Sequence, residues 1–228
     1  MIIAVDGPSG AGKSTLGKKL AAEFGLLYLD TGAMYRAGAL AVLEREGNVY
    51  DTQQTSEIVA RVNLELSGTP ENLRVLIDGR DVTNEIRTPG VSQAASIMSA
   101  IPSVRRILVE RQRTLGARGA GCVLDGRDIG TVVFPQADVK FFLTASPESR
   151  AARRFAELKT KNVETTFSQT LSEINERDAR DASRHDSPLK IASDAIVIDS
   201  TELSLEQVFA RMLTVVRAKQ NSHSVLQS

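Results

Sequence analysis

The residues whose types and spacing predict chemistry most directly lie near the start of the chain. The stretch Gly7-Pro-Ser-Gly-Ala-Gly-Lys-Ser14 matches the pattern Gly-x-x-x-x-Gly-Lys-Ser/Thr. Its glycines allow backbone N–H groups to point at phosphate oxygens, while Lys13 can reach the β- and γ-phosphates and Ser14 can ligate Mg²⁺. An apolar run precedes the stretch and a helical pattern follows it, as a phosphate loop requires. The sequence therefore predicts a nucleotide-binding loop.

This loop alone leaves the class of protein open. A glycine-rich turn between a strand and a helix can also occur without a ligand, and the same motif serves kinases, GTPases and motor ATPases. The tetrad Asn-Lys-x-Asp, which commonly reads guanine, is absent from the sequence, and its absence disfavours a GTPase switch. Residues outside the loop are needed to choose among the remaining classes.

Arginines far from this loop in the sequence predict a second anion site. Arg36 closes the segment Asp-Thr-Gly-Ala-Met-Tyr-Arg, and Arg127 lies within Asp-Gly-Arg-Asp. Transfer between two phosphorylated molecules brings many negative charges together, so it needs such arginines. Helical spacing also places several charged residues of 176–184 on one face: Arg177, Arg180, Asp181 and Arg184. For this cluster alone, a solvated helix with alternating ion pairs is an equally good interpretation.

Strands that alternate with helices are expected to position these residues. Apolar runs predict strands at 2–5, 26–29, 122–125, 139–143 and 195–199. Helical patterns occupy 14–24, 35–46, 103–115, 147–181 with a break around 162–166, and 205–218. Strands at 64–66 and 73–77, with a turn at Asp78-Gly79, predict a small β insertion. This order predicts an α/β fold with a parallel sheet covered by helices on both faces.

The composition bounds the class of protein further. The 228 residues suffice for one compact enzyme, and 42% apolar and 25% charged residues are ordinary for a globular protein. Cys122 is the only cysteine, which excludes an internal disulfide and a cysteine-based zinc site and favours a cytoplasmic location. The apolar start runs into Asp6 without a basic leader, and no run of about eighteen apolar residues occurs. We therefore expect neither secretion nor a membrane partner.

A nucleic-acid partner is a further alternative, because four arginines make 103–115 a basic helix: Arg105, Arg106, Arg111 and Arg113. Against it, 28 lysines and arginines balance 28 aspartates and glutamates, so long-range attraction to a nucleic-acid backbone is not expected. Aromatic residues make up 4% of the chain and tryptophan is absent, which disfavours a stacking platform for single strands. We therefore expect no nucleic-acid partner.

Five segments together resemble the bacterial cytidylate kinases. They are Asp-Gly-Pro-Ser-Gly-Ala-Gly-Lys-Ser at 6–14, Asp-Thr-Gly-Ala-Met-Tyr-Arg at 30–36, Glu-Ile-Arg-Thr at 85–88, Asp-Gly-Arg-Asp-Ile-Gly-Thr-Val-Val-Phe-Pro at 125–135, and Glu-Arg-Asp-x-Arg-Asp at 176–181. The resemblance extends from Ile2 to about Lys219, and the combination is far more specific than the phosphate loop alone. It implies a monomeric phosphotransferase that uses ATP and Mg²⁺ to convert CMP or dCMP to the diphosphate.

The resemblance also implies a division of the chain. A P-loop kinase core would comprise 1–62, 94–147 and 186–220, a β-containing monophosphate-binding insertion 63–93, and a helical lid 148–185. The polar residues 221–228 are expected to form a flexible tail.

Site residues follow from the positions that match the family's motifs. The implied ATP site comprises Gly7, Pro8, Ser9, Gly10, Ala11, Gly12, Lys13, Ser14 and Thr15. The implied CMP site comprises Thr31, Arg36, Ser96, Arg105, Arg127, Asp128, Arg177, Asp181 and Arg184. The implied catalytic residues are Lys13 and three arginines that clamp the acceptor phosphate, Arg36, Arg127 and Arg184.

The resemblance assigns finer roles within this set. Ser96, Arg105 and Asp128 would contact cytosine, and Arg177 and Asp181 would contact the ribose. Taken alone, Ser96 is typical of a helix surface. With Ser14, a further residue is a candidate for Mg²⁺: Asp125, which ends an apolar strand, either holds the ion through water or orders a loop.

Two other kinds of protein remain as alternatives. One is a related kinase for UMP, AMP or a non-nucleotide such as shikimate, and the other is an ATP-binding switch without transfer activity. Cytosine presents a 4-amino donor and the acceptors N3 and O2, so a carboxylate beside an arginine suits its pocket. Every matched position carries its expected residue, which favours an active CMP kinase. The preference between CMP and dCMP and the tolerance of UMP stay open.

Overall fold

Five parallel strands form the central sheet, in the order β2-β6-β1-β7-β8. The structure is a computed structural model, and it describes residues 1–225. The strands are β1 (Ile2–Asp6), β2 (Leu27–Asp30), β6 (Cys122–Gly126), β7 (Val139–Thr144) and β8 (Ile196–Asp199). All of β6 is buried, as expected for a strand covered on both faces, and Cys122 packs there in the core. The predicted parallel sheet is confirmed.

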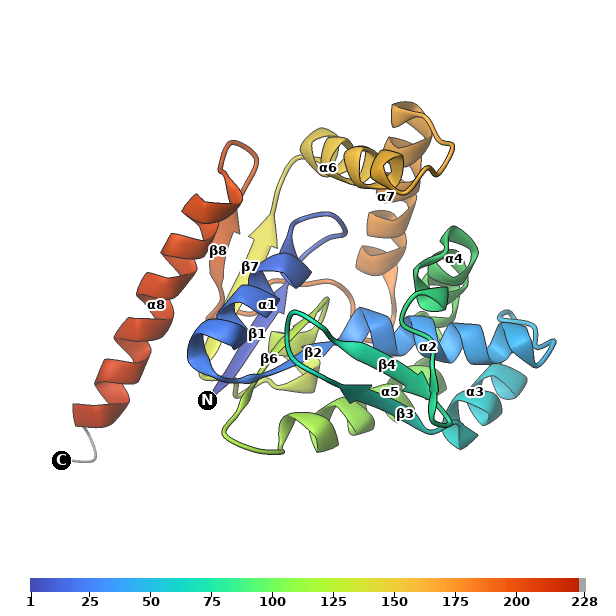
Figure 1. The fold of residues 1–228 in the computed structure, drawn as a ribbon, viewed down its shortest axis with the longest axis horizontal. Helices are drawn as coiled ribbons and strands as arrows, with labels where there is room; N and C mark the ends of the chain where they lie inside the picture. The colour runs from blue at the N-terminus through green and yellow to red at the C-terminus, as the bar shows by residue number, and fades with distance from the viewer. Residues whose placement is uncertain (226–228) are drawn as a thin grey trace.

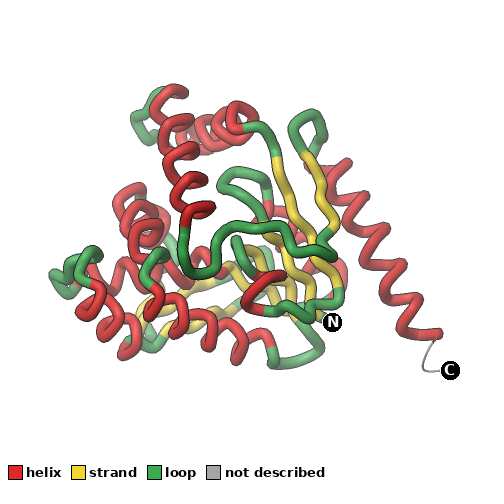
Figure 2. The backbone as a smooth tube through the Cα atoms, turned by 180° about the vertical axis from the view of Figure 1, so that it is seen from behind, coloured by secondary structure: helices red, strands yellow, loops and turns green. Residues whose placement is uncertain are grey.

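Helices cover both faces of this sheet (Figures 1 and 2). The larger ones are α1 (Lys13–Phe24), α2 (Thr31–Glu44), α5 (Pro102–Gly116), α6 (Pro147–Thr160), α7 (Phe167–Ser183) and α8 (Leu205–Val225). On one face, Leu16 of α1 and Met212 of α8 pack in one core with Ile3. On the other, Val109 of α5 packs with Ala4, because successive residues of a strand point to opposite faces.

A second, antiparallel sheet lies beside α2 and contains β3 (Leu64–Ser67), β4 (Arg74–Ile77) and β5 (Arg80–Asp81). Its turn at Asp78-Gly79 has positive φ at both residues, 49° and 82°, as the predicted hairpin requires. Val75 and Ile77 pack in the same core as residues of α2, α3 (Thr52–Arg61) and α4 (Pro89–Met98). The strands therefore rest on helices and are not an isolated hairpin.

Within residues 1–225, four helical segments were not predicted from the sequence: α3, α4, the short 3-10 helix η1 (Glu85–Arg87) and the π-helical turn η2 (Ile129–Val133). The Asp51 side chain caps α3 by accepting from Gln53 and Gln54 N–H groups, and Thr88 caps α4, which begins at Pro89. A capping residue, and a proline at the first helical position, are sequence signals for a helix start, so both helices could have been found. A π-helical turn has no comparable signal.

The predicted helical break at 162–166 is confirmed, since α6 ends at Thr160 and α7 begins at Phe167. Thr166 starts α7 with a reciprocal capping box to Gln169. At the other end of the chain, α8 reaches Val225, so 221–225 of the predicted tail are helical and 226–228 lie outside the described residues. No helix in the described part of the chain has both the length and the apolar character that a membrane span needs.

The carboxyl ends of the parallel strands meet at one edge of the sheet. The phosphate loop follows β1, Asp30 ends β2, Arg127 follows β6, and α6 begins just beyond β7. In Figure 1 the helices α6 and α7 lie above this edge. Ligands of open α/β sheets bind at this edge, so the fold brings the predicted site residues together.

Candidate active site

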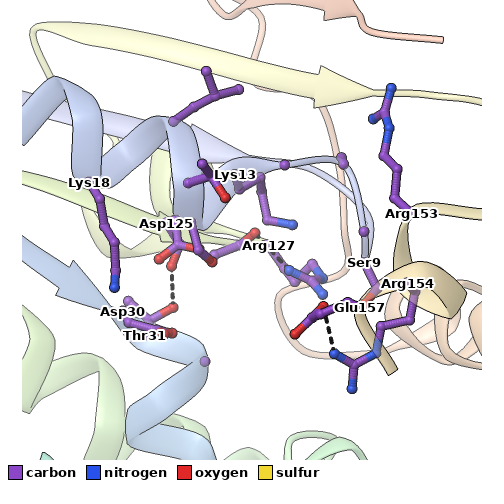
Figure 3. Close-up of a pocket in the computed structure, with 18 of the residues that line it drawn as sticks. Ser9, Lys13, Lys18, Asp30, Thr31, Asp125, Arg127, Arg153, Arg154 and Glu157 are labelled. Atoms are coloured by element: carbon purple, nitrogen blue, oxygen red, sulfur yellow. Dashed lines mark hydrogen bonds and ion pairs between the residues drawn. The ribbon is translucent and has the colours of Figure 1, made fainter. Parts of the chain in front are cut away.

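A cavity of about 1200 Å³ lies at this edge and contains most of the predicted site (Figure 3). The predicted residues that line it are Ser9, Gly10, Ala11, Gly12, Lys13, Ser14, Thr15, Thr31, Arg36, Arg105, Arg127, Asp128, Arg177, Asp181 and Arg184. Gly7, Pro8 and Ser96 do not line it. Segments separated by more than a hundred residues in the sequence therefore share one cavity.

The phosphate loop has the backbone that its glycines predict. Gly7, Gly10 and Gly12 have φ values of 143°, 77° and 87°, in the region that favours glycine. Lys13 is buried, and its Nζ donates to the Pro8 carbonyl at 2.6 Å across the loop. Burial lowers the pKa of Lys13 well below its ordinary value, and the nearby charge of Arg127 lowers it further. An anionic phosphate in the loop would restore the charged form.

Asp125, at the end of β6, joins the phosphate loop to the neighbouring strand. Its carboxylate accepts from the Ser14 hydroxyl at 2.6 Å and from the Tyr28 hydroxyl at 2.8 Å, and its carbonyl accepts from Thr31 at 2.7 Å. Burial raises the pKa of Asp125, and the charge of Asp30 raises it further. Both sequence interpretations of Asp125 thus have a physical basis, because it orders the loop and also faces the cavity.

The residues present fit a Mg²⁺ ion. The Ser14 hydroxyl and an Asp125 carboxylate oxygen lie 2.6 Å apart beside the cavity, and Mg²⁺ prefers one or two protein oxygens completed by phosphates and water. Among residues 1–225 there is no group of three or more His, Cys, Asp or Glu side chains that could hold a metal ion without a substrate.

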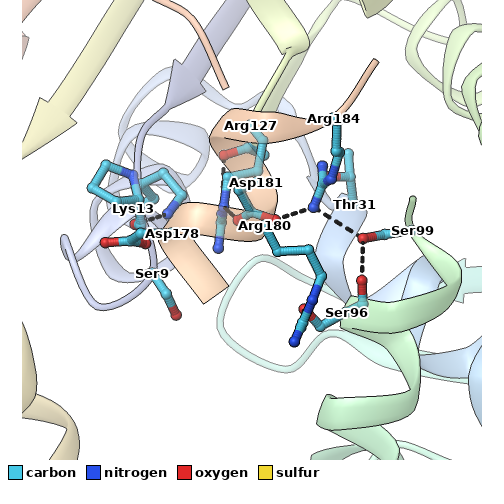
Figure 4. A network of polar contacts seen from close by, with 12 residues as sticks. Ser9, Lys13, Thr31, Ser96, Ser99, Arg127, Asp178, Arg180, Asp181 and Arg184 are labelled. Atoms are coloured by element: carbon cyan, nitrogen blue, oxygen red, sulfur yellow. Dashed lines mark hydrogen bonds and ion pairs between the residues drawn. The ribbon is translucent and has the colours of Figure 1, made fainter. Parts of the chain in front are cut away.

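Arginines from α7 and from the loop after β6 converge on one buried carboxylate (Figure 4). Asp181, 1% exposed, pairs with Arg127 at 2.8 Å and with Arg184. Arg184 also donates to the Ser99 hydroxyl at 2.9 Å, which ties α7 to α4. Burial opposes ionisation of Asp181, but the arginines around it hold its pKa below the ordinary value. For 176–184, the structure therefore excludes the solvated-helix interpretation.

Two more arginines add to the positive lining of the cavity. Arg36 pairs with Asp30 at 3.1 Å, while Asp30 also caps α2 through the Ala33 N–H. Burial lowers the pKa of Arg177, and the charge of Arg127 lowers it further, to about 10. Four guanidinium Nε–H groups around the cavity are buried without a partner, on Arg36, Arg105, Arg177 and Arg184. These donors are suited to an anion.

The predicted base-reading residues divide into a pair and a separate contact. Arg105, 3% exposed, pairs with Asp128 and donates to the Ser99 carbonyl at 3.1 Å. Ser96 is also buried, although its pattern taken alone is typical of a helix surface, and its hydroxyl accepts from Arg180 at 2.5 Å. The structure thus separates Ser96 from the cavity lining and joins it to Arg180 of α7.

The structure adds site residues that sequence reasoning did not assign. Tyr35 and Ser99 line the cavity, and the Tyr35 hydroxyl is buried without a partner. Arg150 of α6 donates to the Ser9 carbonyl at 3.1 Å and pairs with Asp178 of α7 at 2.6 Å, so it connects the phosphate loop to α6 and α7. Tyr35 lies inside a motif already identified, 30–36, whereas Arg150 had no signal beyond an ordinary charged helix.

Comparison with known proteins agrees with this geometry. Residues 3–218 match the family model described as Cytidylate kinase. Curated relatives named cytidylate kinase include those of Caldanaerobacter subterraneus subsp. tengcongensis, 50% identical over 94% of each chain, and Caldicellulosiruptor bescii, 48% identical over 92% of this chain and 93% of the relative. That of Solibacter usitatus is 46% identical over 96% of this chain and 93% of the relative.

Among solved structures, a gluconokinase from Sinorhizobium meliloti 1021 matches 99% of this chain and 96% of its own, with a TM-score of 0.50 and 14% identity. That likeness concerns the fold alone. The family model matches residues 3–218, and curated relatives are near half identical along almost the whole chain. This chain therefore belongs to the cytidylate kinase family.

Proposed function

We propose that this protein transfers the γ-phosphoryl group of ATP to CMP or dCMP, giving ADP and CDP or dCDP. One observation supports this most strongly: a phosphate loop with its lysine and a cluster of separated arginines line the same cavity. A switch protein that only binds ATP has no use for the second cluster. An acceptor that itself carries a phosphate accounts for it.

The residues support transfer by positioning and charge neutralisation. Lys13 would contact the β- and γ-phosphates of the donor, and Arg36, Arg127 and Arg184 would hold the acceptor phosphate in line with it. The acceptor is already an anion, so no general base is required. Closure of 148–185 over the cavity would exclude water and limit hydrolysis of ATP.

The base of the acceptor is assigned to the pair formed by Arg105 and Asp128. Their charges are buried against each other, so the pocket presents both a donor fork and a carboxylate acceptor. This suits the edge of cytosine, with its amino group and its N3 and O2 atoms. Arg177 and Asp181 are proposed to contact the ribose, and Thr31 to lie near the acceptor.

Mg²⁺ is proposed to arrive with ATP and to be held by Ser14, with Asp125 acting through water. When bound, the ion neutralises charge on the β- and γ-phosphates. One apolar side of the cavity is assigned to the adenine ring of ATP. It is lined by Leu203, Leu205, Val208 and Phe209. An apolar wall of this kind suits a purine ring.

The decisive experiment measures ADP formation from ATP and Mg²⁺ with CMP, dCMP, UMP, AMP and shikimate as acceptors, against a sample without acceptor. We expect CMP and dCMP to be the best substrates and EDTA to abolish the reaction. A preference for UMP, AMP or shikimate would contradict the assigned acceptor, and equal ADP formation with and without every acceptor would contradict a kinase.

The division into P-loop core, insertion 63–93 and lid 148–185 is part of the proposal, as are a monomeric state and a cytoplasmic location. Sedimentation, at the enzyme concentrations used in the assay, tests the monomeric state. Nucleic acid is not proposed as a partner: Arg105, Arg111 and Arg113 of the basic helix all donate to groups of this chain. Retention of the protein on heparin at low salt would instead support binding of nucleic acid.

A further inference from the structure

Asp6 connects the donor half of the site to the acceptor half, although it contacts neither nucleotide in the proposed function. It ends β1 directly before the phosphate loop and is 4% exposed. Its two carboxylate oxygens accept from the backbone N–H groups of Ile129 at 2.8 Å and Gly130 at 2.7 Å. Both acceptor oxygens of a buried carboxylate are thus used on two consecutive backbone donors.

Asp6 also holds the other end of the same loop. In the parallel register of β1 and β6, Asp6 is paired with Gly126. The chain then continues through Arg127 and Asp128 and returns to Ile129, which the Asp6 side chain binds. The two-residue segment Arg127-Asp128 is therefore anchored on both sides by one residue.

The anchored segment carries two of the charged contacts of the acceptor site. Arg127 pairs with Asp181, and Asp128 pairs with Arg105, from opposite sides of the same short loop. Their directions depend on where the backbone from Gly126 to Ile129 lies. A displacement of about 1 Å of a side chain that contacts the substrate is enough to lower the rate or the affinity by a large factor.

We propose that Asp6 is a positioning residue that aligns Arg127 and Asp128 for the acceptor nucleotide. This inference rests on the proposed function, in which Arg127 holds the acceptor phosphate and Asp128 the cytosine base. Loss of the carboxylate would free the start of η2 and let both side chains move. Recognition of the acceptor would then suffer more than binding of ATP, because the phosphate loop is also held by bonds that Asp6 does not make, from Lys13 to the Pro8 carbonyl and from Arg150 to the Ser9 carbonyl.

The test compares Asp6→Asn with Asp138→Asn. Asp138 is a matched control, since its carboxylate accepts from a backbone N–H at the opposite end of the same strand, Ile2 N–H at 2.7 Å, away from the cavity. In Asp6→Asn one carboxylate oxygen becomes an NH₂ group that cannot accept. We expect at least a tenfold rise in KM for CMP and a severalfold loss of the preference for CMP over UMP. KM for ATP should stay within threefold, and Asp138→Asn should match the wild type.

Wild-type kinetics separate failure of this inference from failure of the proposed function. If the wild type does not prefer CMP, the proposed function is wrong before any variant is compared. If the wild type prefers CMP and Asp6→Asn keeps both its KM for CMP and its preference, only the positioning role is wrong. Equal rises in KM for ATP and CMP would also overturn it, since they would indicate general damage to the sheet.

A second variant covers the case in which Asp6→Asn does not fold. Asp6→Glu keeps the charge and both acceptor oxygens on a longer side chain, and we expect a smaller rise in KM for CMP with part of the preference retained. An unchanged KM for CMP in a folded Asp6→Glu variant that has lost the bond to Ile129 by NMR would overturn the proposal. So would loss of folding in both variants, because Asp6 would then support the sheet and not the site.

Discussion

Two adjacent arginines show that the surroundings of a residue determine its role. Arg105 is buried against Asp128, whereas Arg106, next to it in α5, is exposed. A lysine at 105 keeps the charge but lacks the planar fork that reaches both Asp128 and the Ser99 carbonyl. We expect Arg105→Lys to lower kcat/KM for CMP about tenfold to a hundredfold, equivalent to about 1.4–2.8 kcal/mol.

Arg106→Lys is the matched control for this change and should leave kcat/KM for CMP within twofold. Steady-state kinetics with varied CMP at saturating ATP measure both variants. Equal, small effects of the two substitutions would remove Arg105 from the base-reading pair.

The Asp6 carboxyl predicts a pH dependence of stability. Burial raises its pKa from 3.8 to about 6 in the folded protein, and Asp128 adds to the rise, while the N–H groups of Gly130 and Ile129 and the charge of Lys13 oppose it. The native state therefore binds more protons than the unfolded state between these values, so this group's contribution to stability decreases as pH rises from about 4 to about 6. The full change is about 3 kcal/mol, from about 1.4 kcal/mol per pKa unit.

Urea unfolding of the wild type and Asp6→Asn at pH 4.5 to 7.5 measures this contribution. The free energy of unfolding of the wild type minus that of the variant should fall up to about pH 6 and then stay level. A constant difference across the range would show that the pKa of Asp6 is not raised by folding.

At the scale of elements, the passage from β1 into the phosphate loop depends on one glycine. Gly7 has φ 143°, and a Cβ there would lie 2.0 Å from the Leu143 carbonyl oxygen of β7. Neither the backbone angle nor the neighbouring strand can accommodate a side chain without movement. We expect Gly7→Ala to lower the free energy of unfolding by about 3 kcal/mol or more and to impair ATP binding.

Gly90 provides the comparison, because it lies near the start of α4 and a Cβ there would meet nothing within 4 Å. Gly90→Ala should be neutral or should stabilise by up to about 1 kcal/mol, since alanine reduces the freedom of the unfolded chain. Chemical denaturation of both variants tests the pair. Similar destabilisation by the two substitutions would mean that the contact with β7 does not control the loop.

At the scale of the whole molecule, the cavity concentrates positive charge in a chain with no net charge. Burial lowers the pKa values of both Lys13 and Arg177, and the charge of Arg127 lowers them further, so like charges oppose one another there. A phosphate would relieve this repulsion while it binds the folded state. At a CMP concentration of about 100 times Kd, mass action adds about 2.7 kcal/mol of stability, which corresponds to a Tm increase of about 5–10 °C.

Thermal unfolding with CMP and with cytidine distinguishes the phosphate from the base. CMP should raise Tm, and cytidine at the same concentration should raise it much less, because it lacks the group that the arginines bind. The increase with CMP should shrink in Arg184→Lys. Equal increases with CMP and cytidine would contradict an arginine-lined phosphate site.

The sequence by itself determined the parts of this protein that depend on local pattern. Apolar runs predicted all five parallel strands, and the glycine spacing predicted the phosphate loop, because strand burial and positive φ are properties of short segments. Family motifs then named the arginines of the site. The same local patterns did not predict α4, and the pattern around Ser96, which alone is typical of a helix surface, did not indicate that this side chain is buried.

Only the tertiary structure decided which distant residues meet. The pairing of Asp181 with Arg127, and the bonds from Asp6 to Ile129 and Gly130, join segments 54 and up to 124 residues apart. Such contacts depend on the order of strands in the sheet, and a one-residue change of register would turn each side chain to the opposite face. The spacing of residues along the chain does not reveal the order of the strands. The role of Asp6 in holding both ends of the segment Arg127-Asp128 can therefore be seen only in the tertiary structure.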